Sequence, residues 1–292
     1  MRLTEVLETI GSLYRANART VIALTAVVAI PAFVLSVIVA RALAPIAERF
    51  AALDPFGTAT TAPSAAMLGD LGAVAALSFA AIAIDQIAIA LIAAALAVAL
   101  GHPGEPALSP GRALRGLPAV ALRLVPAVAI ILAALVGLVL AWIVLQVPLT
   151  VALGATPVGG GPGAFLVLLG VVAVAAAAVF LLVRWSLAAP VAALERSNPV
   201  ATLGRSWSLV GGSTWRVLGY ALLVGVVVVI LDLTLVQSVA AIVSAVVPSA
   251  VTAVEVGLGA VAQVLLAPIG ALLSLVLYHD LRLRATGTQR RL

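Results

Sequence analysis

The chain has 292 residues, of which 64% are hydrophobic and 9% are charged, and its mean hydropathy is +1.28. A soluble domain carries about 25% charged residues, so this composition excludes a water-soluble globular protein. The formal charge of +5 comes from 16 arginines without a single lysine. No stretch resembles a soluble basic domain, so we expect lipid phosphates, and not nucleic acid, to be their partners.

Six apolar stretches follow one another along the chain, and each is long enough for a membrane-spanning helix, since a bilayer core of about 30 Å needs about 20 helical residues. Period-two alternation, which a barrel strand in lipid requires, is absent from them. The sequence therefore predicts an all-α integral membrane protein with one polytopic domain over residues 1–292. The predicted spans are residues 21–40, 71–100, 124–149, 165–183, 217–247 and 256–278. The second and fifth exceed the bilayer core and should tilt, kink or protrude.

The arginines are distributed unevenly between the two sides of this predicted topology. Fourteen fall in the two terminal segments and in the second and fourth connections, whereas only Arg41 and Arg49 fall on the other side. Connections on the cytoplasmic side of a membrane carry the excess of positive charge. The sequence therefore predicts a multi-pass protein of a bacterial inner membrane with both termini cytoplasmic.

Three arginine-bearing segments outside the spans are too apolar for ordinary loops: residues 2–19, 109–123 and 199–216. Apolar side chains recur in them at helical spacing, such as Val6, Ile10 and Leu13 in the first. We predict three cytoplasmic amphipathic helices that lie in the membrane interface, with arginine toward phosphate and apolar side chains toward acyl chains. Each precedes two spans, which predicts a threefold repeat with units 1–100, 108–190 and 197–284.

Two carboxylates, Asp85 and Asp232, fall within the predicted spans, where a charged side chain costs about 3 kcal/mol. Gln86 adjoins the first of them. One interpretation is a proton or cation relay, which would suit a small transporter or a lipid flippase. The other, which we favour, is hydrogen bonding to polar side chains of neighbouring helices.

Tryptophan and arginine alternate between residues 184 and 216. Tryptophan favours the headgroup level and arginine extends its charge toward water, so an interfacial anchor is the simpler interpretation. The alternative is a binding site for a lipid headgroup or a partner protein, in which Arg196 and Arg205 bind phosphate. The residues of this candidate site are Trp185, Arg196, Arg205, Trp207, Trp215 and Arg216.

Motifs of hydrolytic and nucleotide-binding sites were not found in the sequence. The glycine-rich residues 159–163 lack the Lys-Ser/Thr pair of a phosphate-binding loop. Cysteine is absent, and two histidines, His102 and His279, cannot build a metal site alone. We therefore expect no catalytic residues, no metal and no cofactor, and hence no enzyme.

Several residues together resemble a known family. They are Trp185, Pro190, Glu195, the Arg205-Ser206-Trp207 triplet with Leu209 and Val210, Trp215, the segment 13–17 and the closing segment 277–284. The likeness is to the membrane domain of the membrane-anchored glycerophosphoryl diester phosphodiesterases and of stand-alone, YciC-like bacterial membrane proteins. The resemblance implies a six-span helical domain of unassigned activity, without the catalytic domain.

The resulting hypothesis is a non-enzymatic bacterial membrane protein that engages membrane phospholipids, anionic ones above all, or scaffolds a protein partner. The alternative is the small transporter or flippase that uses Asp85 and Asp232. High alanine content and arginine without lysine resemble the composition of proteins from GC-rich bacteria.

Overall fold

The computed structural model describes residues 3–52, 65–101, 108–152, 162–246 and 251–287. Within these ranges every regular element is a helix, and six helices are long and apolar enough to cross a membrane. The elements are α1 (Leu3–Ala16), α2 (Ala18–Ala52), α3 (Ala65–Leu100), α4 (Pro110–Ala152), α5 (Pro162–Trp185), α6 (Ala188–Glu195), α7 (Pro199–Val210), α8 (Thr214–Asp232), the π-helical turn η1 (Leu233–Gln237), α9 (Ser238–Val246) and α10 (Val251–Ala285).

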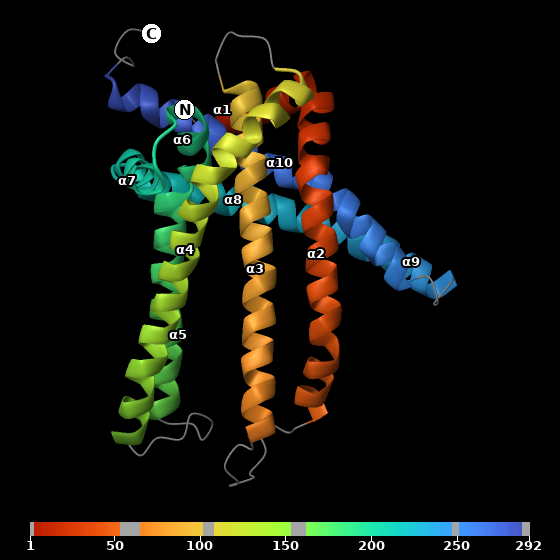
Figure 1. The fold of residues 1–292 in the computed structure, drawn as a ribbon, viewed down its shortest axis with the longest axis vertical. Coiled ribbons are helices and arrows are strands. Elements are labelled where there is room, and N and C mark those ends of the chain that lie inside the picture. The colour runs from red at the N-terminus through yellow and green to blue at the C-terminus, as the bar shows by residue number, and fades with distance from the viewer. Residues whose placement is uncertain (1–2, 53–64, 102–107, 153–161, 247–250, 288–292) are drawn as a thin grey trace.

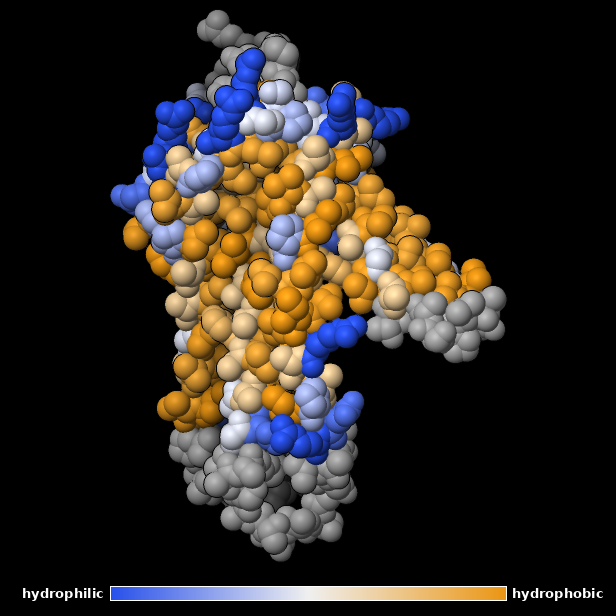
Figure 2. Space-filling model, turned by 45° about the vertical axis from the view of Figure 1, so that its right-hand side comes forward, coloured by the Kyte–Doolittle hydropathy of each residue, from blue (hydrophilic) through white to orange (hydrophobic). Residues whose placement is uncertain are grey.

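The prediction of an all-α membrane protein with six spans is confirmed. The spans of the structure overlap the predicted ones in order and number: Ala18–Ile46, Gly72–Leu100, Pro110–Gln146, Leu168–Glu195, Thr214–Val243 and Ala253–Ala285. Hydrophobic side chains cover the middle of the face shown in Figure 2, and hydrophilic ones gather toward its two ends. This pattern is what a helical protein in a bilayer requires, because lipid tails contact its middle.

The spans form three hairpins, and the third is inclined to the other two (Figure 1). Helices α2, α3, α4 and α5 run alongside one another, whereas α8, α9 and α10 cross behind them and diverge from the bundle. Helices α1, α6 and α7 lie at one end, together with the C-terminal part of α10. The fifth span of the structure, Thr214–Val243, is thus inclined to the first four.

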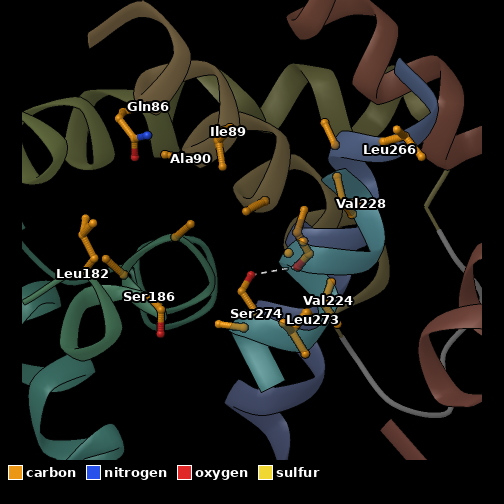
Figure 3. Close-up of a pocket in the computed structure, with 18 of the residues that line it drawn as sticks. Gln86, Ile89, Ala90, Leu182, Ser186, Val224, Val228, Leu266, Leu273 and Ser274 are labelled. Atoms are coloured by element: carbon orange, nitrogen blue, oxygen red, sulfur yellow. Dashed lines mark hydrogen bonds between the residues drawn. The ribbon is translucent and has the colours of Figure 1, made fainter. Parts of the chain in front are cut away.

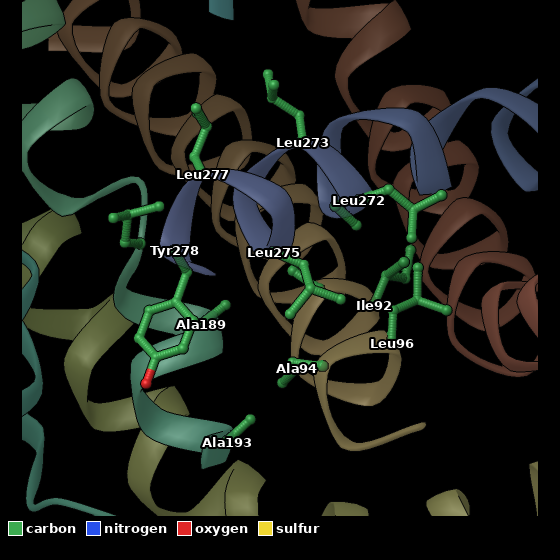
Figure 4. Close-up of a cluster of buried hydrophobic side chains, with 14 of the residues drawn as sticks. Ile92, Ala94, Leu96, Ala189, Ala193, Leu272, Leu273, Leu275, Leu277 and Tyr278 are labelled. Carbon is green, nitrogen blue, oxygen red and sulfur yellow. The ribbon is translucent and has the colours of Figure 1, made fainter. Parts of the chain in front are cut away.

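The core lies where α3, α6 and α10 meet. Small side chains of α3, from Ala93 to Ala97, are buried and let the neighbouring helices approach closely. Leu272, Leu275 and Tyr278 of α10 fill the space beside them, and Figure 4 shows Ala189 and Ala193 of α6 next to the Tyr278 ring. The short helix α6 was not predicted as a separate element, and it is buried from Ala188 to Ala193.

Two of the three predicted amphipathic segments form separate helices, α1 and α7. The apolar face of α1 points to the protein core instead of to acyl chains, since Val6 and Ile10 are only 1% and 5% exposed. The Tyr14 hydroxyl also donates to the carbonyl of Leu265 in α10, at 3.2 Å. Burial raises the pKa of the Tyr14 phenol above its ordinary value of 10.0. Helix α1 is thus packed onto the bundle.

The prediction of a separate helix over residues 109–123 is wrong, because this segment is the beginning of α4. Pro118 and Pro126 lie inside α4, and Figure 1 shows its first part running obliquely before the helix turns along the bundle. A proline inside a helix removes one backbone hydrogen bond and bends the helix without ending it. The amphipathic pattern of residues 109–123 therefore belongs to the oblique first part of α4. The threefold repeat stays a prediction.

Helix α8 passes into α9 through the π-helical turn η1, which directly follows Asp232. A π-helical turn carries one residue more than an α-helical turn, and such turns occur frequently at functional sites. Asp232, which was predicted as an intramembrane carboxylate, therefore lies directly before the π-helical turn between α8 and α9.

Candidate functional site

At one end of the molecule, helices α6 and α7 are joined by a short connection, residues 196–198. Helix α6 ends at Glu195, and the next residue, Arg196, has a φ of 51°, which places it in the left-handed region. Asn198 then caps α7, because its side-chain oxygen accepts a hydrogen bond from the backbone N–H of Ala201 at 2.7 Å, and Pro199 occupies the first helical turn. These local signals bring α7 back over the end of α5.

A polar network joins α6, α7 and α10. The Arg205 Nε lies 3.2 Å from Glu195 Oε2, and the Tyr278 hydroxyl donates to Glu195 Oε1 at 3.0 Å. Arg282 in turn donates to the Tyr278 hydroxyl at 3.1 Å. Arg205 is therefore occupied by a carboxylate of its own chain, so its first role is to hold α7 against α6.

Arg184, at the end of α5, lies between two aromatic rings. Its guanidinium carbon is 5.1 Å from the centre of the Phe180 ring and 4.8 Å from that of Trp207. It also donates to the Trp207 carbonyl at 3.3 Å, and its own carbonyl accepts from Ser206 at 2.9 Å. The Nε atom of Arg184 is buried and has no hydrogen-bond partner among the described residues. These contacts hold the Arg184 guanidinium in place, and its Nε–H is left without an acceptor among the described residues.

A cleft of about 620 Å³ opens beside Arg184, between α5 and the start of α8. Its apolar side is formed by α5 residues such as Val179 and Phe180, and its polar side by Arg184, Arg216 and the turn that joins α7 to α8. The backbone N–H groups of Thr214 and Trp215 have no hydrogen bond within the described part of the chain. One side of the cleft therefore suits an anion and the other suits hydrocarbon.

The predicted site residues distribute over three environments. Trp215 and Arg216 line this cleft, and Trp207 lies beside it through its contact with Arg184. Trp185 packs on Trp207, with ring centres 6.1 Å apart, and faces the cavity described below. Arg205 is paired as above, and Arg196 is exposed at the end of α6.

Arg184 was not among the predicted residues, although it begins the predicted Trp–Arg segment. Because Arg184 lies at the end of a span, its sequence position is typical of an interfacial anchor. Only the fold shows that α7 places Trp207 over it and that the α7–α8 turn completes a cleft.

The intramembrane aspartates differ in their surroundings. Asp85 in α3 accepts a hydrogen bond from Ser36 in α2, at 2.9 Å, which agrees with the structural interpretation of this carboxylate. Asp232 is exposed in the isolated chain and has no hydrogen bond or ion pair with any described residue. The two carboxylates therefore do not form one relay pair through contacts that the structure describes.

Replacing Ser36 with alanine should weaken the α2–α3 contact through Asp85. In a double-mutant cycle of Ser36→Ala and Asp85→Ala, we expect a coupling of about 0.6 kcal/mol and not above about 1.7 kcal/mol, as for other hydrogen bonds between membrane helices. Unfolding in mixed micelles measures it. The control cycle combines Asp85→Ala with Thr234→Ala, because the Thr234 hydroxyl donates to a carbonyl of its own helix at 2.7 Å. This control cycle should give no coupling energy. A coupling near zero for Ser36 would contradict the contact.

A larger cavity of about 900 Å³ lies between the first two hairpins and the inclined third one. Figure 3 shows Gln86, Ile89 and Ala90 on one side of it, Leu182 on another, and Val224, Val228 and Ser274 opposite. Asp232 and Gln263 also line it. The cavity is therefore mostly apolar with a few polar groups, as small-molecule sites are.

The spans, the arginine-rich end and the two hollows define the class of this chain, a polytopic helical membrane protein. Comparison with protein-family models, with curated proteins and with solved structures gives no match. In the ranges that the structure describes, no three His, Cys, Asp or Glu residues group in a way that could hold a metal ion.

Proposed function

We propose that this chain is a non-enzymatic bacterial inner-membrane protein that binds an anionic phospholipid in the cleft between α5 and α8. The observation that carries the proposal is the composition of that cleft, which combines two arginines with an apolar helix face. The phosphate would lie between Arg184 and Arg216, near the free N–H groups at the start of α8. The acyl chains would follow α5 into the bilayer.

The charge of the cleft favours anionic over zwitterionic lipid. Helix α8 directs the positive end of its dipole at the cleft, and both arginines add to that field. No carboxylate is among the described residues of its lining, so nothing there would attract the cation of a zwitterionic headgroup. Trp215, which is 85% exposed, would lie at headgroup level beside the bound lipid.

Removing both charges of the cleft should release the lipid. We expect Arg184→Gln with Arg216→Gln to reduce retention of phosphatidylglycerol at least tenfold, because two charge-assisted contacts to phosphate are lost. Native mass spectrometry of protein from mixed phosphatidylglycerol and phosphatidylcholine nanodiscs measures this retention. Arg216→Gln alone changes an exposed residue and separates lipid loss from any effect of Arg184 on folding.

The matched control is Arg112→Gln with Arg115→Gln. It removes the same charge from two exposed positions at the beginning of α4, away from the lining of the cleft. If this control lost as much lipid as the cleft variant, binding would reflect the overall charge and the site would be refuted. Stoichiometric copurification of a protein in place of lipid would favour the scaffold hypothesis instead.

A small transporter or flippase remains the second candidate, and one observation favours it. Asp232 faces a cavity that spans much of the third hairpin. Transport that depends on this carboxylate would be lost in Asp232→Asn and kept in Asp85→Asn, whose parent side chain is already bonded to Ser36. Flux assays in proteoliposomes would distinguish the two functions.

A further inference from the structure

We propose that the cavity between the hairpins is a second binding site, for a long-chain amphiphile whose polar end carries a single positive charge, such as a protonated amine. The ammonium group would pair with Asp232, and the hydrocarbon chain would lie along α8. This site differs in place and in charge from the phospholipid cleft at α5, and neither proposal depends on the other.

The first support is the shape and lining of the cavity. Its wall follows α8 from Val217 to Asp232 and the next residue, Leu233 of η1, a distance of about 24 Å at 1.5 Å per residue. Helices α2, α3, α4, α5, α6 and α10 supply the other walls, mainly with alanine and leucine side chains. A volume of about 900 Å³ in such a wall suits an extended hydrocarbon chain.

The second support is the charge inside the cavity. Asp232 is the one ionisable side chain among the described lining residues, so the lining carries no cation that could neutralise it. Asp232 lies within the span Thr214–Val243, where an unpaired carboxylate is costly, and a bound cation lowers that cost. The lining therefore selects a positive ligand by charge complementarity.

The third support is the state of the other polar groups. The Ser186 and Ser274 hydroxyls each donate to a carbonyl of their own helical turn, at 2.8 Å, and so have no donor left for a ligand. Gln86 and Gln263 line the cavity and have no hydrogen bond with a described residue. Their amide oxygens can accept hydrogen bonds from a ligand in the cavity, and an ammonium group has three protons to donate.

The fourth support is the backbone at Asp232. The π-helical turn η1 begins at the next residue, Leu233, so the carboxylate lies where the helix changes its pitch. Turns of this kind occur frequently where a helix contributes to a functional site.

The same observations exclude neighbouring classes of ligand. A fatty acid would bring a second negative charge toward Asp232. A long-chain alcohol would leave that carboxylate without a counter-charge. A zwitterionic phospholipid would bring a phosphate into a lining without any described cation.

The test uses the full chain in nonionic detergent and three probes of equal chain length, dodecylamine, dodecanol and dodecanoate. We expect dodecylamine to bind at least tenfold more tightly than the other two by native mass spectrometry. Asp232→Asn should remove this preference, and Asp85→Asn, a carboxylate bonded to Ser36 and outside the lining, should keep it.

A second variant tests the cavity itself. Gly225 lines it, and a Cβ atom added there meets no atom within 4 Å, so Gly225→Leu would place a larger side chain in this space. It should weaken all three probes while phosphatidylglycerol retention at the α5 cleft stays unchanged. Equal binding of amine and alcohol, an amine preference that survives Asp232→Asn, or phosphatidylethanolamine binding as tight as dodecylamine would each overturn the proposal.

Discussion

Tyr278→Ala is expected to lower the free energy of unfolding by about 3–5 kcal/mol, as other truncations of large buried side chains do. Tyr278 is fully buried where α10 meets α6, so its removal leaves a cavity that two alanines, Ala189 and Ala193, cannot fill. The variant also takes a hydrogen-bond donor from Glu195 and an acceptor from Arg282. Denaturation in mixed micelles, followed by circular dichroism, measures the loss.

Tyr278→Phe separates the ring from the hydroxyl. Glu195 keeps Arg205 as its partner and Arg282 is exposed, so the loss should be only about 1 kcal/mol. If the phenylalanine variant were as unstable as the alanine variant, the hydroxyl network and not the packed ring would hold α10 to α6.

Gly101→Ala is expected to cost about 2–3 kcal/mol, because the new methyl group has no room. Gly101 follows the last residue of α3, and a side chain there would overlap the carbonyl oxygen of Ala97 and lie 2.6 Å from Leu194 Cδ2. Relief requires a shift of the α3 backbone or of α6, which forms part of the core. The midpoint of thermal unfolding in detergent is the simplest measurement.

The control for this substitution is Gly137→Ala in α4, where an added side chain meets nothing within 4 Å. Alanine is a better helix former than glycine by about 1 kcal/mol in a helix interior, so stability should stay level or rise. Equal losses at both positions would mean that glycine is needed for a reason other than the contact with Ala97 and Leu194.

The sequence was sufficient to predict the six spans, because each is a local property: a run of apolar residues long enough for a bilayer. It also predicted α1 and α7 from helical spacing. It misjudged residues 109–123, since the same spacing fits a separate helix and the oblique beginning of a longer one, and Pro118 did not end α4. The inclination of the third hairpin depends on packing between distant segments, which one sequence does not show.

For the candidate sites too, the sequence was informative where the signal is local and uninformative where the site depends on packing between distant segments. Trp215 and Arg216 were identified from composition, and both line the α5–α8 cleft. Glu195 pairs with Arg205 and also accepts a hydrogen bond from Tyr278, which lies 83 positions further along the chain, so no local pattern could reveal this network. Asp232 was identified by its cost in a span, whereas the cavity around it is lined by residues of seven helices and of η1.

The π-helical turn at Leu233–Gln237 also bears on the ancestry of the chain. Geometrically, such a turn is a helix with one inserted residue, so the later residues of the same helix, Ser238–Val246, are rotated by about 100° relative to an unbroken helix. If the three units descend from one duplicated ancestor, aligning the third with the others requires a one-residue gap between Asp232 and Ser238. An ungapped comparison would pair non-equivalent faces of the helix over Ser238–Val246, and so would conceal such a duplication.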